Sequence, residues 1–518
     1  MDTNLVLLLT VGVAWLLGIP RVVHAARLGQ AGWLVVYALV LLFTGLGSLF
    51  WLPYFGTASA CLFGLLVVLP SILQRQLWQL LGAQQYARAL RVAGALRILH
   101  PADGLWQLPS LIAALDAGQR GDIAGAERGL SQIVTSGSKA LVPQARVHLF
   151  RIRGDWQGYL DSTQQPDSAQ LARDLAQLNA RLRALGETGQ LEQMVTTYAE
   201  HKLRLAAPAN THLRLYSQLF VAAFCGRQDV LERLFSGPLG FLGTATHLYW
   251  RGTCAHAAGD AETGDAALRG LLNHQDAGIA HGARLRLARP PVAAAERLST
   301  EAQAQLDDLA LQVDQEARFG EGAQMLAPRM TRALVALNLL AFVGEVLAGG
   351  SEDELALYRM GALVSGSLSA DNAWRLLMAL FLHLGPLHLA MNMLGLLVLG
   401  PFVETGLGRL RMLTAYLASG LTGSLIVASL DSAPASLFLG ASGCIMGLLG
   451  ATAAILVHGY RTERASTAVR RLWRIALVML LQLGFDLTVP NISMTAHWSG
   501  IAMGALLGYV LVVTRRAR

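Results

Sequence analysis

A serine and a histidine in the last third of this chain each lie near one end of an apolar run. Ser442 lies in LFLGASGCIMGLLG, and His497 lies in SMTAHWSGIAMGALLG. A serine hydroxyl is a weak nucleophile until a neighbouring base takes its proton, and histidine is the commonest such base. An ionisable side chain within an apolar segment is costly and marks a candidate functional site. The pair predicts nucleophilic catalysis, whereas either residue alone is more often a packing or interfacial residue.

A second polar group lies in LHLGPLHLAMNML, which carries His383, His388 and Asn392. His388 and Asn392 are four residues apart and therefore share one helix face. Cleavage of an amide generates an oxyanion, and each side-chain or backbone donor that stabilises it contributes roughly 2.7–4 kcal/mol. The pair predicts such a donor set, with an interhelical polar contact as the alternative. No carboxylate or cysteine accompanies the histidines at ligand spacing, so we expect no metal and no cofactor.

These residues lie among six apolar segments, each near the ~20 residues that a helix needs to cross a membrane. Arginines cluster at alternate ends of the segments, and the positive-inside rule places those ends in the cytoplasm. Ser442 and His497 are then at the same depth, at the outer ends of the fourth and sixth segments. This matched depth predicts that they form one site. The segments are 331–348, 384–402, 409–429, 441–458, 473–489 and 494–513.

Glycines give two of these segments small faces that allow close packing of their backbones. Such close packing is what a serine on one helix needs to reach a histidine on another. The fourth segment carries Gly440, Gly443, Gly447 and Gly450, and the sixth carries Gly500 and Gly504.

In order and spacing, the motifs of residues 330–515 resemble those of the rhomboid intramembrane serine proteases. The matching residues are Gly440, Ser442 and Gly443 of a GxSG block, His497, Gly500 and Gly504 of an AHxxGxxxG block, the pair His388 and Asn392, Trp374 and Arg375 of the long outer loop, and Glu404 with Gly408.

The resemblance implies a six-helix core with a Ser–His dyad rather than a triad, and cleavage of transmembrane substrates near their outer ends. It makes Ser442 the nucleophile and His497 the general base and acid. His388, Asn392 and the Ser442 backbone N–H would form the oxyanion hole beside Gly440, with His383 as a supporting residue. Trp374, Arg375, Glu404 and the glycines Gly443, Gly500 and Gly504 would be structural.

Two residues of this region need separate comment. Members of the family often carry tyrosine four residues after the nucleophile, where it packs on the catalytic histidine, and this chain has Met446 there. A methionine can still contact an aromatic ring through its sulfur. Asp486, near the outer end of the fifth segment, reads as an interfacial, structural residue.

The chain before residue 329 predicts two further domains. Residues 1–75 contain three apolar segments, at 4–20, 33–52 and 57–74, which we interpret as transmembrane helices. Residues 76–325 follow an arginine cluster and are therefore expected in the cytoplasm. They show amphipathic helical periodicity, with glycine turns 33 to 38 residues apart at Gly121, Gly154, Gly189, Gly226 and Gly264. This spacing predicts a TPR-like helical-repeat domain, with a non-repeating helical bundle as the alternative fold. Such a domain is expected to bind a protein partner, with a spacer as the alternative role.

Composition agrees with an all-α polytopic membrane protein. Of the 518 residues, 53% are hydrophobic and 14% are charged, against about 25% charged in soluble proteins. The net charge of +7 comes from arginines that flank spans, so nucleic-acid binding is not expected. The four cysteines form no CxxC pair and indicate no disulfide framework. The Ala, Leu, Gly and Arg content suggests a bacterial inner membrane, with the protease domain 329–518 opening to the periplasmic side.

The predicted function is thus an intramembrane serine endopeptidase acting on transmembrane proteins in the lipid bilayer. The first alternative is an inactive rhomboid-like protein that binds transmembrane segments, and it is disfavoured because both Ser442 and His497 are present. The second is a transporter, which predicts paired, interrupted spans that this sequence lacks.

Overall fold

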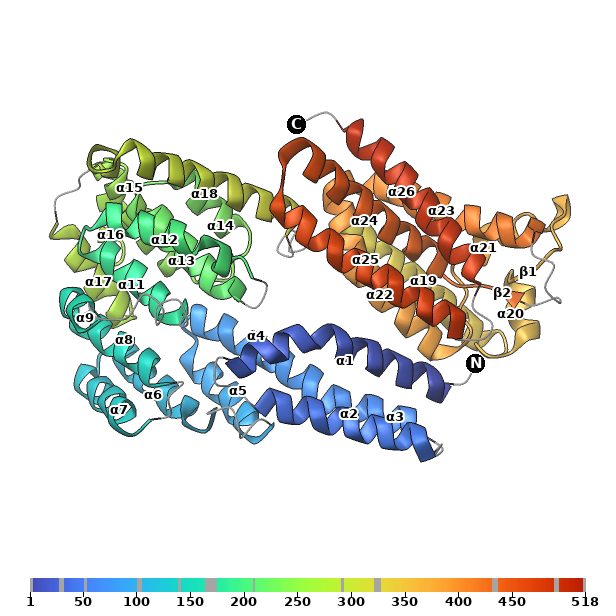
Figure 1. Cartoon of the computed structure of the whole chain (residues 1–518), viewed down its shortest axis with the longest axis horizontal. Helices are drawn as coiled ribbons and strands as arrows, with labels where there is room; N and C mark the ends of the chain where they lie inside the picture. The colour runs from blue at the N-terminus through green and yellow to red at the C-terminus, as the bar shows by residue number, and fades with distance from the viewer. Residues whose placement is uncertain are drawn as a thin grey trace. The chain divides into compact units, whose positions relative to one another are not determined.

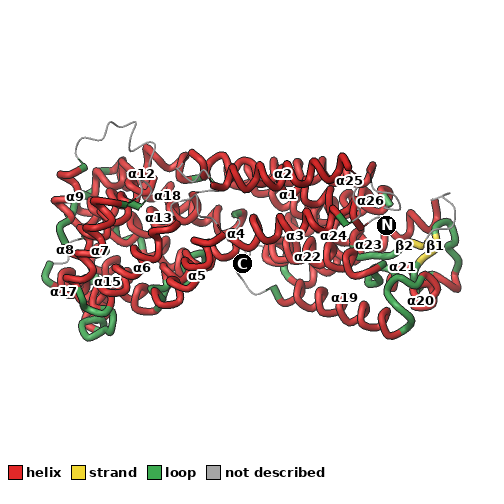
Figure 2. The backbone as a smooth tube through the Cα atoms, turned by 90° about the horizontal axis from the view of Figure 1, so that it is seen from below, coloured by secondary structure: helices red, strands yellow, loops and turns green. Residues whose placement is uncertain are grey.

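The computed structural model describes residues 3–27, 32–50, 54–99, 105–137, 141–163, 175–207, 210–289, 293–320, 328–430, 437–488 and 493–515. Helices make up nearly all of these residues (Figure 1), and the strands among them form one short antiparallel pair (Figure 2). Strand β1 (Leu363–Val364) pairs with β2 (Leu437–Phe438). The chain divides into two compact units, Asp2–Val313 and Asp314–Arg518. The predicted all-α fold is confirmed.

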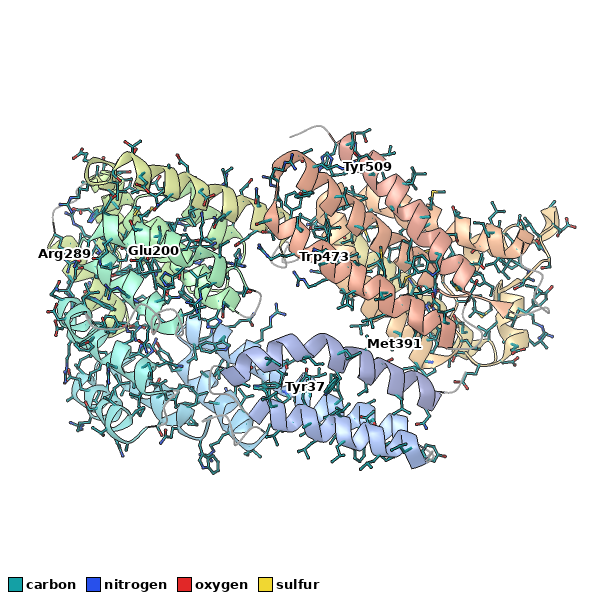
Figure 3. The ribbon with its side chains drawn as sticks, in the orientation of Figure 1. Tyr37, Glu200, Arg289, Met391, Trp473 and Tyr509 are labelled. Atoms are coloured by element: carbon teal, nitrogen blue, oxygen red, sulfur yellow. The ribbon has the colours of Figure 1, made fainter. Side chains whose placement is uncertain are left out.

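The first unit opens with long helices at the three apolar segments of residues 1–75. The indole N–H of Trp15 donates to the backbone oxygen of Tyr37 at 3.0 Å, and the Tyr37 side chain packs between the first two helices (Figure 3). The continuous helix Phe55–Gly82 is long and apolar enough to cross a membrane. The elements are α1 (Thr3–Arg27), α2 (Gly32–Phe50), α3 (Phe55–Phe63), one π-helical turn η1 (Gly64–Val68) and α4 (Leu69–Gly82).

The rest of the first unit is a succession of shorter helices, several of them joined by tight glycine turns. Four of the five expected turn glycines have left-handed φ angles between +69° and +90°. Glycine is favoured there because it has no Cβ to clash with the backbone. The fifth turn lies at Gly259 (φ +84°) rather than at the expected Gly264, which is inside a helix against the His256 ring. The reason is Asp260, whose side chain accepts the Thr263 N–H and starts the next helix.

These helices lie where amphipathic periodicity predicts them, and their kinship with TPR repeats stays a prediction. Their bounds are α5 (Tyr86–Leu99), η3 (Leu105–Gln107), α6 (Leu108–Gln119), α7 (Ile123–Ser136), α8 (Val142–Arg153), α9 (Trp156–Ser162), α11 (Leu175–Glu187), α12 (Leu191–Leu205), α13 (Thr211–Phe224), α14 (Gln228–Ser236), α15 (Thr244–Ala257), α16 (Ala261–Arg269), α17 (Ala277–Leu287), η5 (Ala294–Arg297) and α18 (Thr300–Phe319).

The second unit contains long helices at all six predicted segments. Five of them are long and apolar enough to cross a membrane, and α25 carries three arginines in its first half. With Phe55–Gly82, these spans make the chain a multi-pass integral membrane protein. The long helices are α19 (Arg329–Leu347), α22 (Gly385–Leu407), α23 (Arg409–Leu430), α24 (Ser442–Glu463), α25 (Ser466–Thr488) and α26 (Met494–Val513). The connection between α19 and α22, which we call the outer loop, adds α20 (Glu354–Met360), η7 (Ala370–Asn372) and α21 (Arg375–Met378).

Helices α24 and α26 pack against each other through glycines. A Cβ added at Gly500 would lie 2.4 Å from the backbone oxygen of Gly443, and one added at Gly504 would lie 1.9 Å from that of Gly447. Both distances are far below normal contact, so the two backbones touch directly only because these positions lack side chains. We call these four residues the glycine seam.

We expect Gly504→Val to destabilise the protein by at least about 1–3 kcal/mol, because an overpacked interface must separate. The check is the thermal unfolding midpoint of the purified protein in detergent, followed by circular dichroism. Ala502→Val is the matched control, because Ala502 is an exposed residue of the same helix. Equal midpoints for the two variants would contradict the direct backbone contact.

Candidate active site

Ser442 is the first residue of α24 and follows a strained glycine turn. Gly440 has φ +127°, and its N–H donates to the backbone oxygen of Ala379 at 2.8 Å. A Cβ at Gly440 would lie 2.9 Å from both Cε1 and Nε2 of His388. The pairing of β2 with β1 of the outer loop holds the segment just before this turn. Gly440 is thus needed both for the backbone conformation and for the close approach of the imidazole.

His497 lies in the first turn of α26 and is held by a buried carboxylate. Its Nδ1 is 2.9 Å from Asp486 Oδ1, and the Asp486 side chain is fully buried. Gln482 of the same helix as Asp486 donates to that oxygen at 2.7 Å. A carboxylate can only accept here, so Nδ1 carries the hydrogen and Nε2 keeps a lone pair. This is the tautomer that a general base acting through Nε2 requires.

The glycine seam brings the two candidate residues to the same level. A Cβ at Gly443, one residue after Ser442, would lie 3.8 Å from the backbone oxygen of Ala496, one residue before His497. The start of α24 and the first turn of α26 are therefore in contact. The structure thus gathers Ser442, His497 and His388, which come from three different helices.

His388 is oriented by a backbone hydrogen bond. The N–H of Leu384 donates to His388 Nδ1 at 3.3 Å, so Nδ1 accepts and the hydrogen of the neutral ring is on Nε2. That Nε2, together with Cε1, faces the Gly440 turn. An N–H donor therefore lies beside Gly440, close to the start of the Ser442 helix, as an oxyanion hole requires.

The two other polar residues near the start of α22 are already partly engaged. Asn392 is buried and donates one N–H to the backbone oxygen of His388 at 2.9 Å, which leaves it one further N–H. His383 is fully buried with its ring centroid 5.3 Å from that of His388. Among the residues that the structure describes, no three His, Cys, Asp or Glu side chains could hold a metal ion.

The residues expected to be structural have packing or capping contacts. Both oxygens of the buried Glu404 carboxylate accept backbone N–H groups, from Met330 and Thr331 at 2.9 Å, and so cap the start of α19. Arg375 donates to the backbone oxygens of Ala362, at 2.9 Å, and Tyr358, and its guanidinium lies 4.0 Å from the Tyr358 ring centroid.

Trp374, which is half exposed, packs over Gly361. A Cβ at Gly361, whose φ is +115°, would lie only 2.5 Å from the indole ring. The outer loop is therefore folded around these two neighbouring side chains, Trp374 and Arg375, and carries strand β1 that pairs with β2.

Sequence reasoning missed two buried carboxylates. Asp486 was expected at the membrane–water interface, whereas in the structure it is buried and contacts His497 Nδ1. Its position eleven residues before His497, across a helix hairpin, was the available signal, because the end of one helix lies beside the start of the next. Glu345 of α19 is also fully buried and accepts the backbone N–H of His383 at 2.9 Å. A charged residue inside an apolar span is itself a signal.

The second unit is similar in sequence to known proteins. The rhomboid domain family matches residues 370–514. The chain is 36% identical to RHOMBOID-like protein 5 of Arabidopsis thaliana over 30% of its own length and 50% of that protein. It is 33% identical to the rhomboid protease GluP of Bacillus subtilis over 34% of each chain. It is 30% identical to the rhomboid relative YdcA of Bacillus subtilis over 28% of its own length and 70% of that protein.

The first listed of these relatives are matched over only a third to a half of their own length. No solved structure matches the chain. The family match lies in the second unit.

We expect Gly440→Ala to slow the labelling of Ser442 by a fluorophosphonate by about tenfold or more. The added methyl group strains a left-handed turn, by roughly 1–3 kcal/mol, and displaces the His388 ring. Gly350→Ala is the control, because Gly350 has a similar φ of +123° and no atom within 4 Å of the added Cβ. Similar labelling rates for the two variants would contradict a role for the Gly440–His388 contact.

Proposed function

Because the chain belongs to the rhomboid family, we propose that it is an intramembrane serine endopeptidase that hydrolyses peptide bonds in or near transmembrane segments of membrane proteins. The observation that carries this proposal is the Asp486–His497 hydrogen bond at 2.9 Å. It leaves His497 Nε2 as a base, in a helix whose first turn contacts the start of the Ser442 helix. A protein that only binds transmembrane segments has no need of an imidazole held in this tautomer.

In the acylation step, Ser442 Oγ attacks the carbonyl carbon of the scissile peptide while His497 Nε2 takes the hydroxyl proton. The tetrahedral intermediate then collapses: its C–N bond breaks, and His497 gives the proton to the leaving amine. A water molecule next attacks the Ser442 ester, with His497 again taking and returning one proton. The carboxylate product leaves, and Ser442 regains its hydroxyl.

The oxyanion of the intermediate needs donors placed before the reaction begins. We assign this role to the Ser442 backbone N–H, at the free N-terminal end of α24, and to His388 Nε2–H beside the Gly440 turn. The remaining N–H of Asn392 would be a third donor from the same face of α22. His383 packs behind His388 and helps to hold its ring in place.

Asp486 extends the expected dyad to a Ser–His–Asp arrangement. It does not touch substrate, so we assign it as a positioning residue that orients His497 and stabilises the imidazolium during the reaction. Family members often have an aromatic residue at the position of Met446, and its ring packs on the catalytic histidine. Met446 has no ring, so Asp486 would orient His497 in its place.

The proposed orientation puts the site on the periplasmic side of a bacterial inner membrane. It is supported by basic residues at one end of the second unit. Two of these arginines also have structural partners, because Arg411 donates to the Leu511 backbone oxygen at 2.8 Å and Arg515 to that of Thr405 at 3.0 Å. By the same rule, we place residues 76–325 in the cytoplasm.

We expect Ser442→Ala and His497→Ala each to lower cleavage of a single-span reporter substrate in membranes by at least about a thousandfold, because each removes a group that takes part in bond making. Ser424→Ala and His458→Ala are matched controls from α23 and the far end of α24. Full cleavage by either catalytic-site variant would contradict the mechanism. No cleavage and no fluorophosphonate labelling by the wild type would favour the inactive, binding-only alternative.

We expect Asp486→Asn to lower kcat by about ten- to a thousandfold with little change in KM, because an amide N–H at this position favours the wrong tautomer of His497. The substitution keeps the size of the side chain, so the thermal unfolding midpoint should move much less than kcat. Gln482→Leu removes the second partner of Asp486 and should have a smaller effect. An unchanged kcat in Asp486→Asn would show that the carboxylate plays no part in catalysis.

A further inference from the structure

The first unit encloses a large cavity, which we call the central cavity. Its volume is about 1130 Å³, and α4, α6, α8, α11, α13, α15 and α17 contribute to its wall. An early and a late helix around the cavity are in contact, because Gln119 at the end of α6 donates to Asp276 at the start of α17 at 2.8 Å. Beside Gln119, a Cβ at Gly121 would lie 3.9 Å from Ala277. The cavity is therefore a built feature of the helical domain and separate from the serine site.

The wall of the central cavity carries more positive than negative charge. Five arginines and only two carboxylates line it. Glu187 is shared by three of the arginines, with nitrogen–oxygen distances of 2.9 Å to Arg286, 3.7 Å to Arg183 and 3.9 Å to Arg289. The other carboxylate, Asp276, caps α17 and accepts from Gln119. Neither carboxylate is left to neutralise a further arginine.

Arg183 is surrounded by aromatic rings. Its guanidinium carbon lies 5.1 Å from the ring of Trp156, 5.6 Å from that of Phe220 and 5.3 Å from that of Trp250. Burial lowers the pKa of this guanidinium and Glu187 partly offsets the effect, while the nearby positive charges of Arg151 and Arg286 lower it further. Like charges are thus held together in a poorly solvated place, which favours an anion as a ligand.

The same arginines also affect a histidine in the wall. His148 lines the cavity, and burial together with Arg151 and Arg183 lowers its pKa well below the usual value. Its Nδ1 is buried and has no hydrogen-bond partner among the described residues. A polar atom without a partner in a buried wall is costly and indicates a group that a ligand would satisfy.

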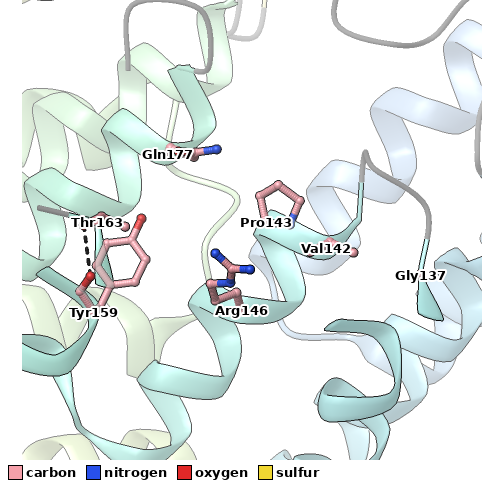
Figure 4. A pocket seen from close by; sticks show the side chains of 7 residues that line it. All are labelled: Gly137, Val142, Pro143, Arg146, Tyr159, Thr163 and Gln177. Atoms are coloured by element: carbon pink, nitrogen blue, oxygen red, sulfur yellow. Dashed lines mark hydrogen bonds between the residues drawn. The ribbon is translucent and has the colours of Figure 1, made fainter. Parts of the chain in front are cut away.

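Size and shape favour a peptide over a small anion. The volume exceeds the roughly 300–1,000 Å³ of small-molecule sites. The wall is also rich in aromatic side chains, and the rings of Trp78 and His212 stack there with centroids 4.9 Å apart. A smaller cavity of about 280 Å³, into which Arg146 projects, shares Pro143 and Gln177 with the central cavity and extends it (Figure 4). Arg289, which also lines the central cavity, is half exposed.

We propose that the central cavity binds an acidic peptide segment of a partner protein, with its carboxylates on Arg183, Arg286 and Arg289 and its apolar side chains on the aromatic wall. The planar guanidinium groups can each bind a carboxylate through two parallel hydrogen bonds. The peptide carboxylates then supply the negative charge that Glu187 alone does not. This site lies in a different unit from Ser442 and does not rest on the proposed protease activity.

The test is fluorescence anisotropy with the full-length protein in detergent and a short labelled peptide of alternating glutamate and leucine or phenylalanine. We expect binding that weakens as salt is raised. Arg183→Gln should weaken it by about tenfold or more, since it removes a buried charge-assisted partner. Glu187→Gln should strengthen it by about threefold or more, because three arginines lose their internal competitor for the peptide.

Arg153→Gln is the matched control and should leave binding unchanged, because Arg153 pairs with Glu127 on the surface, outside the cavity. If Arg183→Gln fails to fold, Arg289→Gln tests the same group from its more exposed edge. Equal binding of a peptide with lysine in place of glutamate would overturn the proposal, as would weaker binding in Glu187→Gln. Uptake of a fluorescent fatty acid but not of the acidic peptide would assign the cavity to a lipid and also overturn it.

Discussion

The candidate active site depends on direct backbone contact between α24 and α26. The glycine seam fixes how far the two helices are apart and also their relative height, since Gly500 meets Gly443 and Gly504 meets Gly447. In a membrane, apolar burial gives helices little reason to associate, so close packing of small residues has to provide it. The depth at which Ser442 and His497 meet is therefore set by residues that have no chemistry of their own.

Two imidazoles in this site have their hydrogens placed by the chain itself. The Leu384 N–H leaves His388 a donor at Nε2, and the Asp486 carboxylate leaves His497 an acceptor at Nε2. Opposite roles are thus assigned to the same kind of side chain by one backbone amide and one carboxylate. Because these partners are already in place, the proposed reaction would need little reorganisation of the site as charge develops on its substrate.

Hydropathy and charge placed the ends of the helices of the second unit within about five residues, since span length and flanking arginines are properties of single segments. The exception is α25, which begins at Ser466 rather than at residue 473. Hydropathy and charge also put Ser442 and His497 at one depth. They could not find the partner of His497, because the Asp486 contact depends on how far α25 is rotated about its axis. Nor could spacing show that Asn392 gives one N–H to its own helix, or that Asp260 moves the last glycine turn to Gly259. Those outcomes are decided by competition among local hydrogen bonds.

The Gln119–Asp276 contact has a kinetic consequence for whatever occupies the central cavity. Because it joins the start of α17 to the end of α6, a ligand that enters between these two helices has to wait until this contact opens. The lifetime of the complex would then follow the opening rate of the helical ring as well as the strength of the ligand's own contacts. A modest affinity at this site would then be compatible with slow exchange, and the helical domain would retain a bound segment for a long time.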